Sequence, residues 1–326
     1  MFMSKSKKSI DATTIKIVAV ICMFIDHFAA AILNRMVEYG IFATNVTLRI
    51  SAATFKLEQL IVWILRGIGR ISFPIFCFFI VEGFFYTKNR WKYALRLLLF
   101  AVISEVPFDL AIFGYVVYGY YQNVYFTLLI GMLTIWGMDV MKDRTEDLFT
   151  AIMFRIGACF IPALYMAGEI RNILSIFFED LSDSTIGDTD FSVIWICTAA
   201  FIYLITVIYQ KKYGKTEVRI FCSRLCLLGI GMLAADLLST DYGSIGIVTI
   251  VLMYLLRGRG RKIFAPLFSI IVLSLTNFSE AISLVDVLLF AKYDGKRGKG
   301  MKYFFYIFYP AHLLLLGIVA RCMKLI

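Results

Sequence analysis

The chain has 326 residues, of which 60% are hydrophobic and only 17% are charged, and its formal net charge is +10. Its mean hydropathy is +0.81. Soluble globular domains carry about a quarter charged residues, so this composition excludes a water-soluble protein. It predicts an all-α protein with a single transmembrane domain over residues 1–326. In such a protein the positive charge indicates orientation in the bilayer rather than nucleic-acid binding.

Apolar segments recur along the whole chain, and a spanning helix needs about 20 mostly apolar residues. The first begins near Ile15, after a polar stretch, and it lacks a small-residue cleavage site, so we expect it to be retained. The predicted helices are approximately 14–33, 59–85, 93–113, 124–141, 148–167, 191–209, 219–238, 243–256, 263–278, 280–291 and 302–320. Because two of these are short, the prediction is a polytopic helix bundle of about ten or eleven spans.

The lysines and arginines between these helices predict which side faces the cytoplasm. The basic segments are the N-terminus, 88–92, 211–219, 257–262 and 292–302, whereas 114–123, 168–190 and 239–242 are poor in both residues. The two sets alternate along the predicted helices, and basic segments stay on the cytoplasmic side of a membrane. We therefore expect a multi-pass plasma-membrane protein with a cytoplasmic N-terminus.

Several ionisable residues fall inside predicted helices, where each costs roughly 2.5 to 3.5 kcal/mol at the helix centre. At about 1.5 Å per residue, His27, Glu105 and His312 lie roughly 16 to 18 Å from the cytoplasmic helix ends. Arg70 lies about as far from the outer end of its helix. The chain has only these two histidines. Buried histidines can simply be hydrogen-bonded core residues, but two at one depth favour a functional site.

The remaining charges allow a structural and a catalytic interpretation. Arg66 and Arg70 share a helix face at i and i+4, and so do Glu105 and Asp109. The two faces could pair as interhelical ion pairs that only hold the bundle. Alternatively, a histidine base beside an arginine that stabilises an oxyanion would perform direct acyl transfer.

A carboxylate beside the base could fix its tautomer. Asp26 precedes His27, but i,i+1 neighbours on a helix do not face each other. We therefore expect Asp26 to contact another helix and Glu105 or Asp109 to orient the base. The sequence has no metal-ligand spacing, no P-loop and no complete dinucleotide-binding fingerprint, so no metal is predicted.

Five ordered segments of the chain stand out together. They are KIVAVICMFIDHF at 16–28, RGIGRISFPIFCFFIVEGFFYTKNRWKYALRLLLFAVISEVPFDL at 66–110, QNVYFTLLIG at 122–131, DYGSIGI at 241–247 and FYPAHLLLL at 308–316. These segments resemble the TraX family of membrane proteins. The namesake of this family N-acetylates the pilin of conjugative F-type pili. The family is also distantly similar to membrane acyltransferases that take acyl groups from cytoplasmic acyl-CoA.

The resemblance implies which residues form the site. It matches Asp26 and His27 to the Asp-His motif of the family and Arg70 to its Gly-Arg-x-x-Phe-Pro motif. The predicted catalytic residues are His27, Asp26, Arg70, His312 and Glu105. Predicted contacts to the acyl donor are Arg66, Lys88, Arg90 and Lys92, and predicted contacts to the acceptor are Asp109, Asn123, Asp241 and Tyr242. Whether His27 or His312 is the base stays open.

The predicted function is transfer of an acetyl group from cytoplasmic acetyl-CoA to an amine or hydroxyl on the other side of the membrane. The acceptor would be an extracytoplasmic peptide or glycan, such as a pilin N-terminus or an envelope glycan. The predicted partners are acyl-CoA, this acceptor and membrane lipid, with no nucleic acid. A proton-coupled transporter or flippase is the alternative, although the sequence lacks the repeat symmetry common in transporters. A structural subunit of an envelope assembly is a third interpretation.

Overall fold

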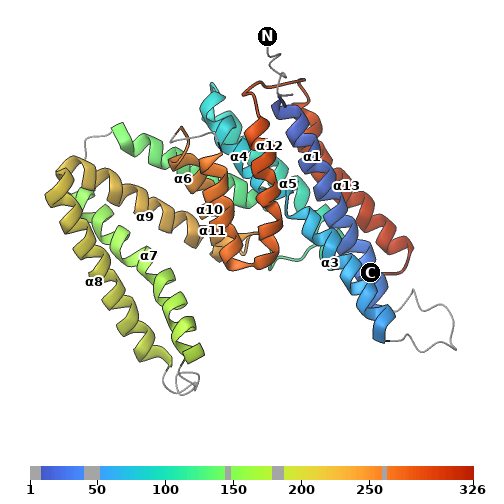
Figure 1. Cartoon of the computed structure of the whole chain (residues 1–326), viewed down its shortest axis with the longest axis horizontal. Helices are drawn as coiled ribbons and strands as arrows, with labels where there is room; N and C mark the ends of the chain where they lie inside the picture. The colour runs from blue at the N-terminus through green and yellow to red at the C-terminus, as the bar shows by residue number, and fades with distance from the viewer. Residues whose placement is uncertain (1–8, 40–51, 144–147, 178–186, 259–262) are drawn as a thin grey trace, which may run out of the picture. The chain divides into compact units, whose positions relative to one another are not determined.

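The structure is a computed structural model that describes residues 9–39, 52–143, 148–177, 187–258 and 263–326. All regular elements in these residues are helices, which confirms the all-α prediction. They are α1 (Ala12–Phe28), the π-helix η1 (Ala29–Leu33), α2 (Asn34–Glu38), α3 (Ala52–Gly69), α4 (Ser72–Tyr86), α5 (Arg90–Phe113), α6 (Val124–Asp143), α7 (Leu148–Phe177), α8 (Gly187–Tyr213), α9 (Lys215–Leu237), α10 (Gly243–Leu255), α11 (Phe264–Thr276), the 3₁₀ helix η3 (Phe278–Val285), α12 (Asp286–Lys292) and α13 (Lys302–Cys322) (Figure 1).

Within the described residues, seven helical segments are long and apolar enough to cross a membrane, so the protein is a multi-pass membrane protein. They are Ala12–Glu38, Lys56–Tyr86, Val124–Lys142, Leu148–Gly168, Phe191–Tyr213, Lys215–Leu237 and Lys302–Cys322. The predicted ten or eleven spans exceed this number. Helix α5 carries several charged residues and is not among the seven, α10 and α11 have only 13 residues each, and the segment 280–291 is divided between η3 and α12. The cytoplasmic location of the N-terminus stays a prediction.

The segment predicted as one helix over 59–85 is instead two helices, α3 and α4, interrupted between Gly69 and Ser72. Pro74 has no N–H and cannot donate to the carbonyl four residues earlier, which belongs to Arg70. The Ser72 hydroxyl donates to the Gly69 carbonyl at 2.7 Å and so satisfies one of the carbonyls at the break. Arg70 therefore lies at a discontinuity of the helix rather than on a regular helical face.

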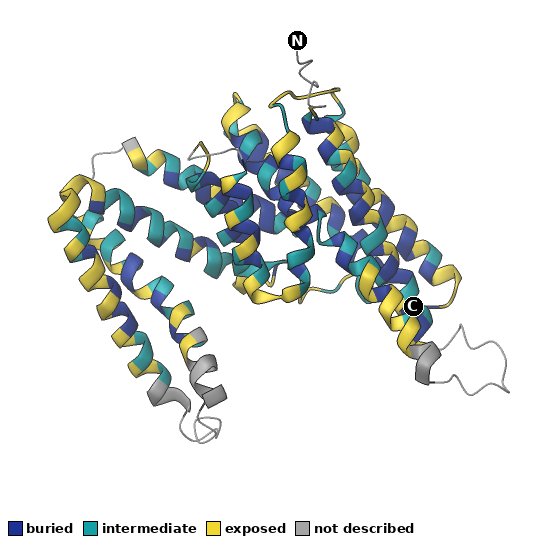
Figure 2. Cartoon of the chain, viewed as in Figure 1, coloured by how far each residue is buried: buried dark blue, intermediate teal, exposed yellow. Residues whose placement is uncertain are grey.

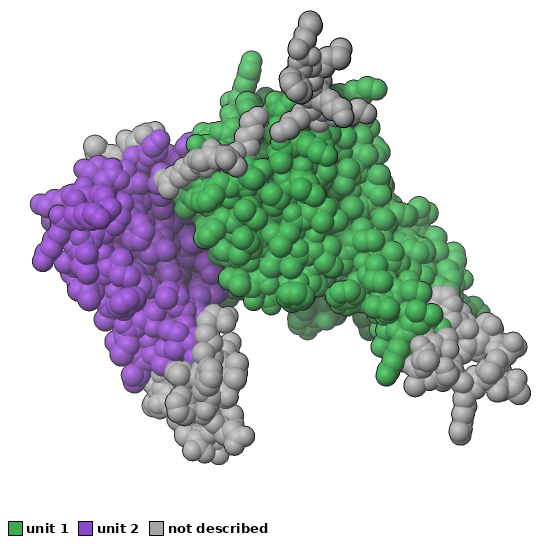
Figure 3. Space-filling view, in the orientation of Figure 1, with its two compact units in different colours: residues 1–132, 235–326 green, residues 133–234 purple. Residues whose placement is uncertain are grey.

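The chain divides into two compact units, drawn in different colours in Figure 3. Unit 1 comprises residues 1–132 and 235–326, and unit 2 comprises residues 133–234. A single membrane domain over 1–326 stays a prediction.

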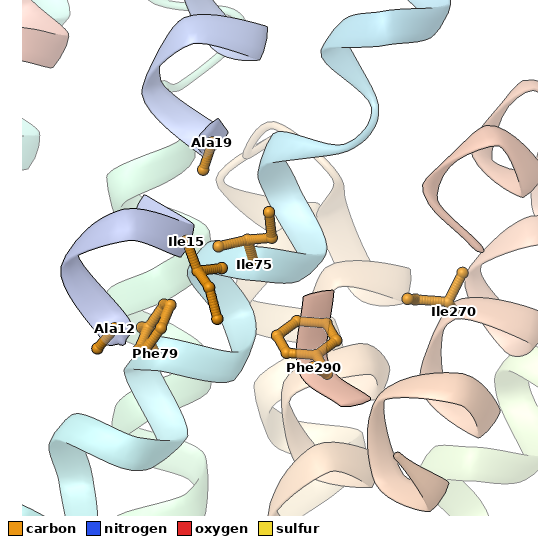
Figure 4. Packing of buried hydrophobic residues seen from close by; sticks show 7 residues of the cluster. All are labelled: Ala12, Ile15, Ala19, Ile75, Phe79, Ile270 and Phe290. Atoms are coloured by element: carbon orange, nitrogen blue, oxygen red, sulfur yellow. The ribbon is translucent and has the colours of Figure 1, made fainter. Parts of the chain in front are cut away.

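Unit 1 has a core in which α1, α4, α11 and α12 meet. Its buried residues are Ala12, Ile15, Ala19, Ile75, Phe79, Ile270 and Phe290 (Figure 4). On α1 the first three recur at spacings of three and four residues, which places them on one helix face. Buried positions gather where the helices of this unit face one another (Figure 2). Of the residues predicted to be catalytic, Asp26 and His27 lie on α1 of this core, and Glu105 and His312 lie on α5 and α13 of the same unit.

Unit 2 contains α7 packed against α8 and the adjoining parts of α6 and α9. Small residues allow close packing here, because a methyl group at Gly157 would overlap Cys226. On α8, Val193, Phe201 and Ile208 are more than half exposed, at 58%, 57% and 57%. Large apolar side chains exposed to this extent are typical of a surface that faces lipid.

Candidate active site

The two histidines meet in the interior of unit 1. Nδ1 of His27, on α1, lies 2.7 Å from Nε2 of His312, on α13. The rings are nearly parallel, with centroids 4.9 Å apart. Both residues are buried, with 9% of His27 and 4% of His312 exposed. Residues 285 positions apart in the sequence thus form a directly coupled pair.

The partners of each ring nitrogen determine the tautomers of this pair. Nδ1 of His312 lies 2.7 Å from the carbonyl oxygen of Phe308, which can only accept a hydrogen bond. His312 therefore carries its proton on Nδ1 when neutral, and its Nε2 accepts a hydrogen bond from Nδ1–H of His27. The remaining nitrogen of His27, Nε2, then carries a lone pair. The geometry thus leaves His27 Nε2 as the basic atom of the pair.

Irregular helix segments lie next to both histidines. The π-helix η1 begins two residues after His27, and π-helical turns are frequent at functional sites. On α13, Pro310 lacks the N–H that would bond the carbonyl of Tyr306. Tyr125 replaces it, because its hydroxyl donates to that carbonyl at 3.3 Å. The helix can therefore accommodate the proline beside His312.

Aromatic rings surround the histidine pair and limit access of water. Tyr309 contacts the edges of both imidazoles, with its ring centroid 5.8 Å from each. Phe308 stacks on His312 at 4.7 Å, and Phe24 lies 6.1 Å from the same ring. The Tyr309 hydroxyl is buried and has no hydrogen-bond partner among the described residues. A substrate group could therefore accept a hydrogen bond from it.

Arg66 and Arg70 each form an ion pair, and neither is a pair suggested by the shared helix faces. Arg66 Nη1 donates to Asp26 Oδ2 at 2.7 Å. Arg70 Nη1 lies 3.1 Å from Oε1 of Glu280, on η3. The alternative in which the two arginines pair with the acidic face of α5 is therefore not the arrangement found in the described residues. Asp26 contacts another helix, as expected from its position next to His27.

A glycine makes the first ion pair possible. A methyl group at Gly69 would overlap the side chain of Asp26, so only glycine lets α1 and α3 approach this closely. The same approach brings Arg66 within reach of the carboxylate. One oxygen of that carboxylate, Oδ1, is buried without a hydrogen-bond partner in the described residues.

The carboxylates of α5 hold the segment 114–123 instead of orienting His27. The Asn123 side-chain amide donates to Glu105 Oε2 and, at 2.8 Å, to the carbonyl of Ala101. The backbone N–H of Tyr118 donates to Asp109 Oδ2 at 2.6 Å. Glu105 and Asp109 were expected to orient the base, but His312 occupies that position.

The segment 239–242 packs against the segment 114–123 and carries two predicted acceptor contacts. The Tyr121 hydroxyl donates to Asp241 Oδ1 at 3.1 Å. Burial raises the pKa of Asp241, and this hydrogen bond together with the positive charge of Arg70 partly offsets that effect. Asp241 therefore belongs to the same electrostatic environment as the arginines.

Tyr242 has a backbone conformation that non-glycine residues seldom adopt, with φ of 65°. Its ring stacks on Phe73 of α4, with centroids 3.6 Å apart and planes 4° apart. Arg70 Nη1 donates to its hydroxyl at 3.5 Å. Strained conformations of this kind persist where packing enforces them and are common at functional sites.

A cavity of about 410 Å³ lies between α2 and α3 and has Arg66 in its wall. Its other lining residues are Asn34, Val37, Glu38, Gln59, Val62 and Trp63. The cavity combines an aromatic ring, amides and a carboxylate, so it can bind a polar group. It leads to the Arg66–Asp26 pair, and Asp26 adjoins His27 in α1.

The predicted acyl-donor contacts are divided between two places. Arg66 lines this cavity, whereas Lys88, Arg90 and Lys92 flank the connection between α4 and α5. Lys88 and Lys92 are exposed. The guanidinium carbon of Arg90 lies 4.2 Å from the ring centroid of Phe84.

A family model described as TraX protein matches residues 11–178 and 194–320. The chain belongs to the TraX family. This confirms the resemblance seen in the five sequence segments. A protein from Dichelobacter nodosus, described as a probable fimbrial assembly protein FimC of serogroup H1, is 25% identical over 320 residues, covering 94% of this chain and 93% of the relative. No solved structure matches the chain.

Three groups in this TraX protein were missed from the sequence. Glu280 partners Arg70, but a single carboxylate in a short apolar segment forms no recognisable sequence pattern. Tyr309 lies inside the FYPAH segment, directly before the proline, where its sequence position does not distinguish it from an aromatic core residue. The carbonyl of Phe308 fixes the tautomer of His312 four residues later, and no sequence pattern reports a backbone acceptor.

Proposed function

We propose that this TraX protein is a membrane-embedded acyltransferase that moves an acetyl group from cytoplasmic acetyl-CoA to an amine or hydroxyl at the extracytoplasmic side. The observation that carries this proposal is the buried His27–His312 pair, whose hydrogen bonds leave a lone pair on His27 Nε2. A single basic nitrogen in a largely apolar interior suits proton removal from a neutral nucleophile.

His27 acts as the general base in this mechanism. Its Nε2 takes the proton of the acceptor N–H or O–H while the acceptor atom forms a bond to the thioester carbonyl carbon. The tetrahedral intermediate then breaks its C–S bond, and the leaving thiolate takes that proton back from His27. The products are the acylated acceptor and free coenzyme A.

His312 is a positioning residue in this mechanism. It holds His27 in one tautomer by accepting the Nδ1–H bond, and it stabilises the imidazolium that forms during the reaction. A carboxylate plays this part in the serine-protease triad. Here a neutral imidazole does so, fixed in turn by the Phe308 carbonyl.

Arg70 is the proposed oxyanion donor. It has five N–H groups, and those on Nη1 contact Glu280 and Tyr242. Its Nε is buried and has no partner among the described residues. A donor held in place by two neighbours can stabilise developing negative charge without reorganising. Glu105, with Asn123, supports the neighbouring segment in this proposal.

The acceptor would enter through the cavity between α2 and α3, on the side predicted to be extracytoplasmic. Glu38 and Gln59 offer hydrogen-bond acceptors, and Arg66 marks its inner end. A pilin or fimbrial subunit is the favoured acceptor class, because the namesake of the family modifies a pilin and the Dichelobacter relative is described as a fimbrial assembly protein. An envelope glycan would fit the same chemistry.

The test compares envelope peptides and glycans by mass spectrometry in cells with and without the gene. We expect one acetyl group to be missing without the gene and restored by the wild type. His27→Ala should fail to restore it, whereas Phe28→Ala, which changes the exposed neighbour, should succeed. Full acetylation with His27→Ala would refute the catalytic assignment. Substrate counterflow in vesicles without acyl donor would indicate the alternative, a transporter.

A further inference from the structure

A second group of charged residues lies at the ends of α1, α5 and α13 that the sequence predicts to be cytoplasmic. It consists of Lys16 on α1, Arg96 on α5, Lys302 at the start of α13 and Arg297 in the segment before it. We call these four residues the inner cationic cluster. Arg297 lies within electrostatic range of both lysines, and Arg96 within range of Lys302.

The fold holds this cluster in place. The backbone before α13 is bound to the start of α1, since Ala12 N–H donates to the carbonyl of Lys296 at 2.9 Å. The Thr13 hydroxyl donates to the carbonyl of Arg297 at 3.0 Å. The Lys16 ammonium lies 4.5 Å from the ring centroid of Phe79 and 5.7 Å from that of Phe305. Aromatic rings, not carboxylates, therefore surround Lys16.

The positive charge of the cluster is not neutralised within the described part of the chain, where no carboxylate lies within 4 Å of any of its four side chains. Nearby carboxylates have other partners: Asp11 accepts the N–H of Thr14 at 2.8 Å, and Asp294 lies 3.8 Å from Lys296. The Nε of Arg96 is buried without a partner among the described residues. Like charges held together repel one another unless an anion binds between them.

The cluster lies at one end of the same helix contact that holds the histidines. Lys16 and His27 are eleven residues apart, which places them on one face of α1 about 16 Å apart. Phe305, which contacts Lys16, is seven residues before His312 and shares its face of α13. The α1–α13 contact thus carries cations at one end and the base near its centre.

That separation matches one class of ligand. In coenzyme A the arm between the diphosphate and the sulfur has about the backbone length of five peptide residues, roughly 16 Å when extended. A ligand with phosphates in the cluster would therefore place its thioester near His27. Phosphate groups also bind well to several lysines and arginines together.

We propose that the inner cationic cluster binds the phosphates of a coenzyme A thioester, the acyl donor of the transfer reaction. This inference rests on the proposed function and identifies the donor site. It differs from the sequence prediction, which assigned the phosphates to Lys88, Arg90 and Lys92.

The experiment measures binding of coenzyme A to the full-length protein in nanodiscs of zwitterionic lipid. Loss of one charged hydrogen bond corresponds to about a tenfold to hundredfold change in affinity. We expect Arg96→Gln and Lys302→Gln each to raise the Kd by that factor. The control variants Lys88→Gln and Lys92→Gln should leave it unchanged, and Lys302→Arg should retain most of the affinity. Adenosine 3′,5′-diphosphate should compete with coenzyme A.

Several results would overturn this inference. The inference fails if the wild type does not bind coenzyme A, or if Arg96→Gln and Lys302→Gln both leave the Kd unchanged. It also fails if the Kd rises only in the two control variants. A lipid phosphate is the competing ligand, so the thermal midpoint is also measured in phosphatidylglycerol nanodiscs. A lipid-dependent rise that Lys302→Gln abolishes, without any effect on coenzyme A affinity, would assign the cluster to lipid headgroups. The midpoint also shows whether a variant is folded.

The outcome is separable from that of the proposed function. His27→Ala should bind coenzyme A like the wild type but transfer nothing. If the protein transfers acetyl groups but the cluster variants bind coenzyme A as tightly as the wild type, only the proposed donor site is refuted. Cluster-dependent binding in a protein whose gene affects no acetylated molecule would refute the acyltransferase function alone.

Discussion

Replacing His312 by alanine tests whether the two histidines act as one unit. In the wild type, Nδ1 of His27 is 2.7 Å from Nε2 of His312, and this bond selects the tautomer with a free Nε2. The variant leaves the buried Nδ1–H of His27 unpaired, which costs about 1 to 3 kcal/mol. If the tautomer with the free Nε2 is destabilised by this amount, kcat drops by about tenfold to hundredfold.

The assay is acetyl transfer by the purified protein to the acceptor identified from the envelope. His312→Ala should lower kcat with little change in KM for the acceptor, and Leu314→Ala, an exposed position on the same helix, should behave like the wild type. His27→Ala should lose more activity than His312→Ala, and the double variant should lose no more than His27→Ala alone. The pH profile should also change in His312→Ala, since the base has lost its partner.

Two results would refute this reasoning. If His312→Ala were more damaging than His27→Ala, then His312 would be the base and the tautomer assignment would be reversed. If the losses in the double variant were additive, the residues would act independently despite their contact. A purely structural role for His312 would lower the thermal midpoint and leave the pH profile of the remaining activity unchanged.

Two further predictions concern the packing around the site. Gly69→Ala should displace Asp26 and cost about 1 to 3 kcal/mol through overpacking, with a loss of activity, whereas Gly119→Ala, which has open space around its added methyl, should be neutral. Normal thermal stability of Gly69→Ala would contradict the close approach of α1 and α3. Tyr125→Phe should cost about 1 kcal/mol and lower Tm by a few degrees, because the Tyr306 carbonyl loses its donor. An unchanged Tm would show that this bond contributes nothing.

The sequence by itself determined the class of the protein and the residues worth considering. Long apolar segments identify membrane helices because the bilayer thickness sets their length. Charged residues inside them are conspicuous because they are costly there. His27, Asp26, Arg70 and His312 were therefore identified as candidates without a structure, and five ordered segments were enough to recognise the TraX family.

Only the tertiary structure decided which of these residues touch. Hydropathy gives the length of a helix but not its rotation about its own axis, which depends on packing against its neighbours. Thus Asp26 pairs with Arg66 because Gly69 lets two helices approach, and Arg70 pairs with Glu280 on a 3₁₀ helix that was predicted as part of a span. The basic nitrogen of His27 follows from a backbone carbonyl, an acceptor that every residue carries and no sequence pattern marks.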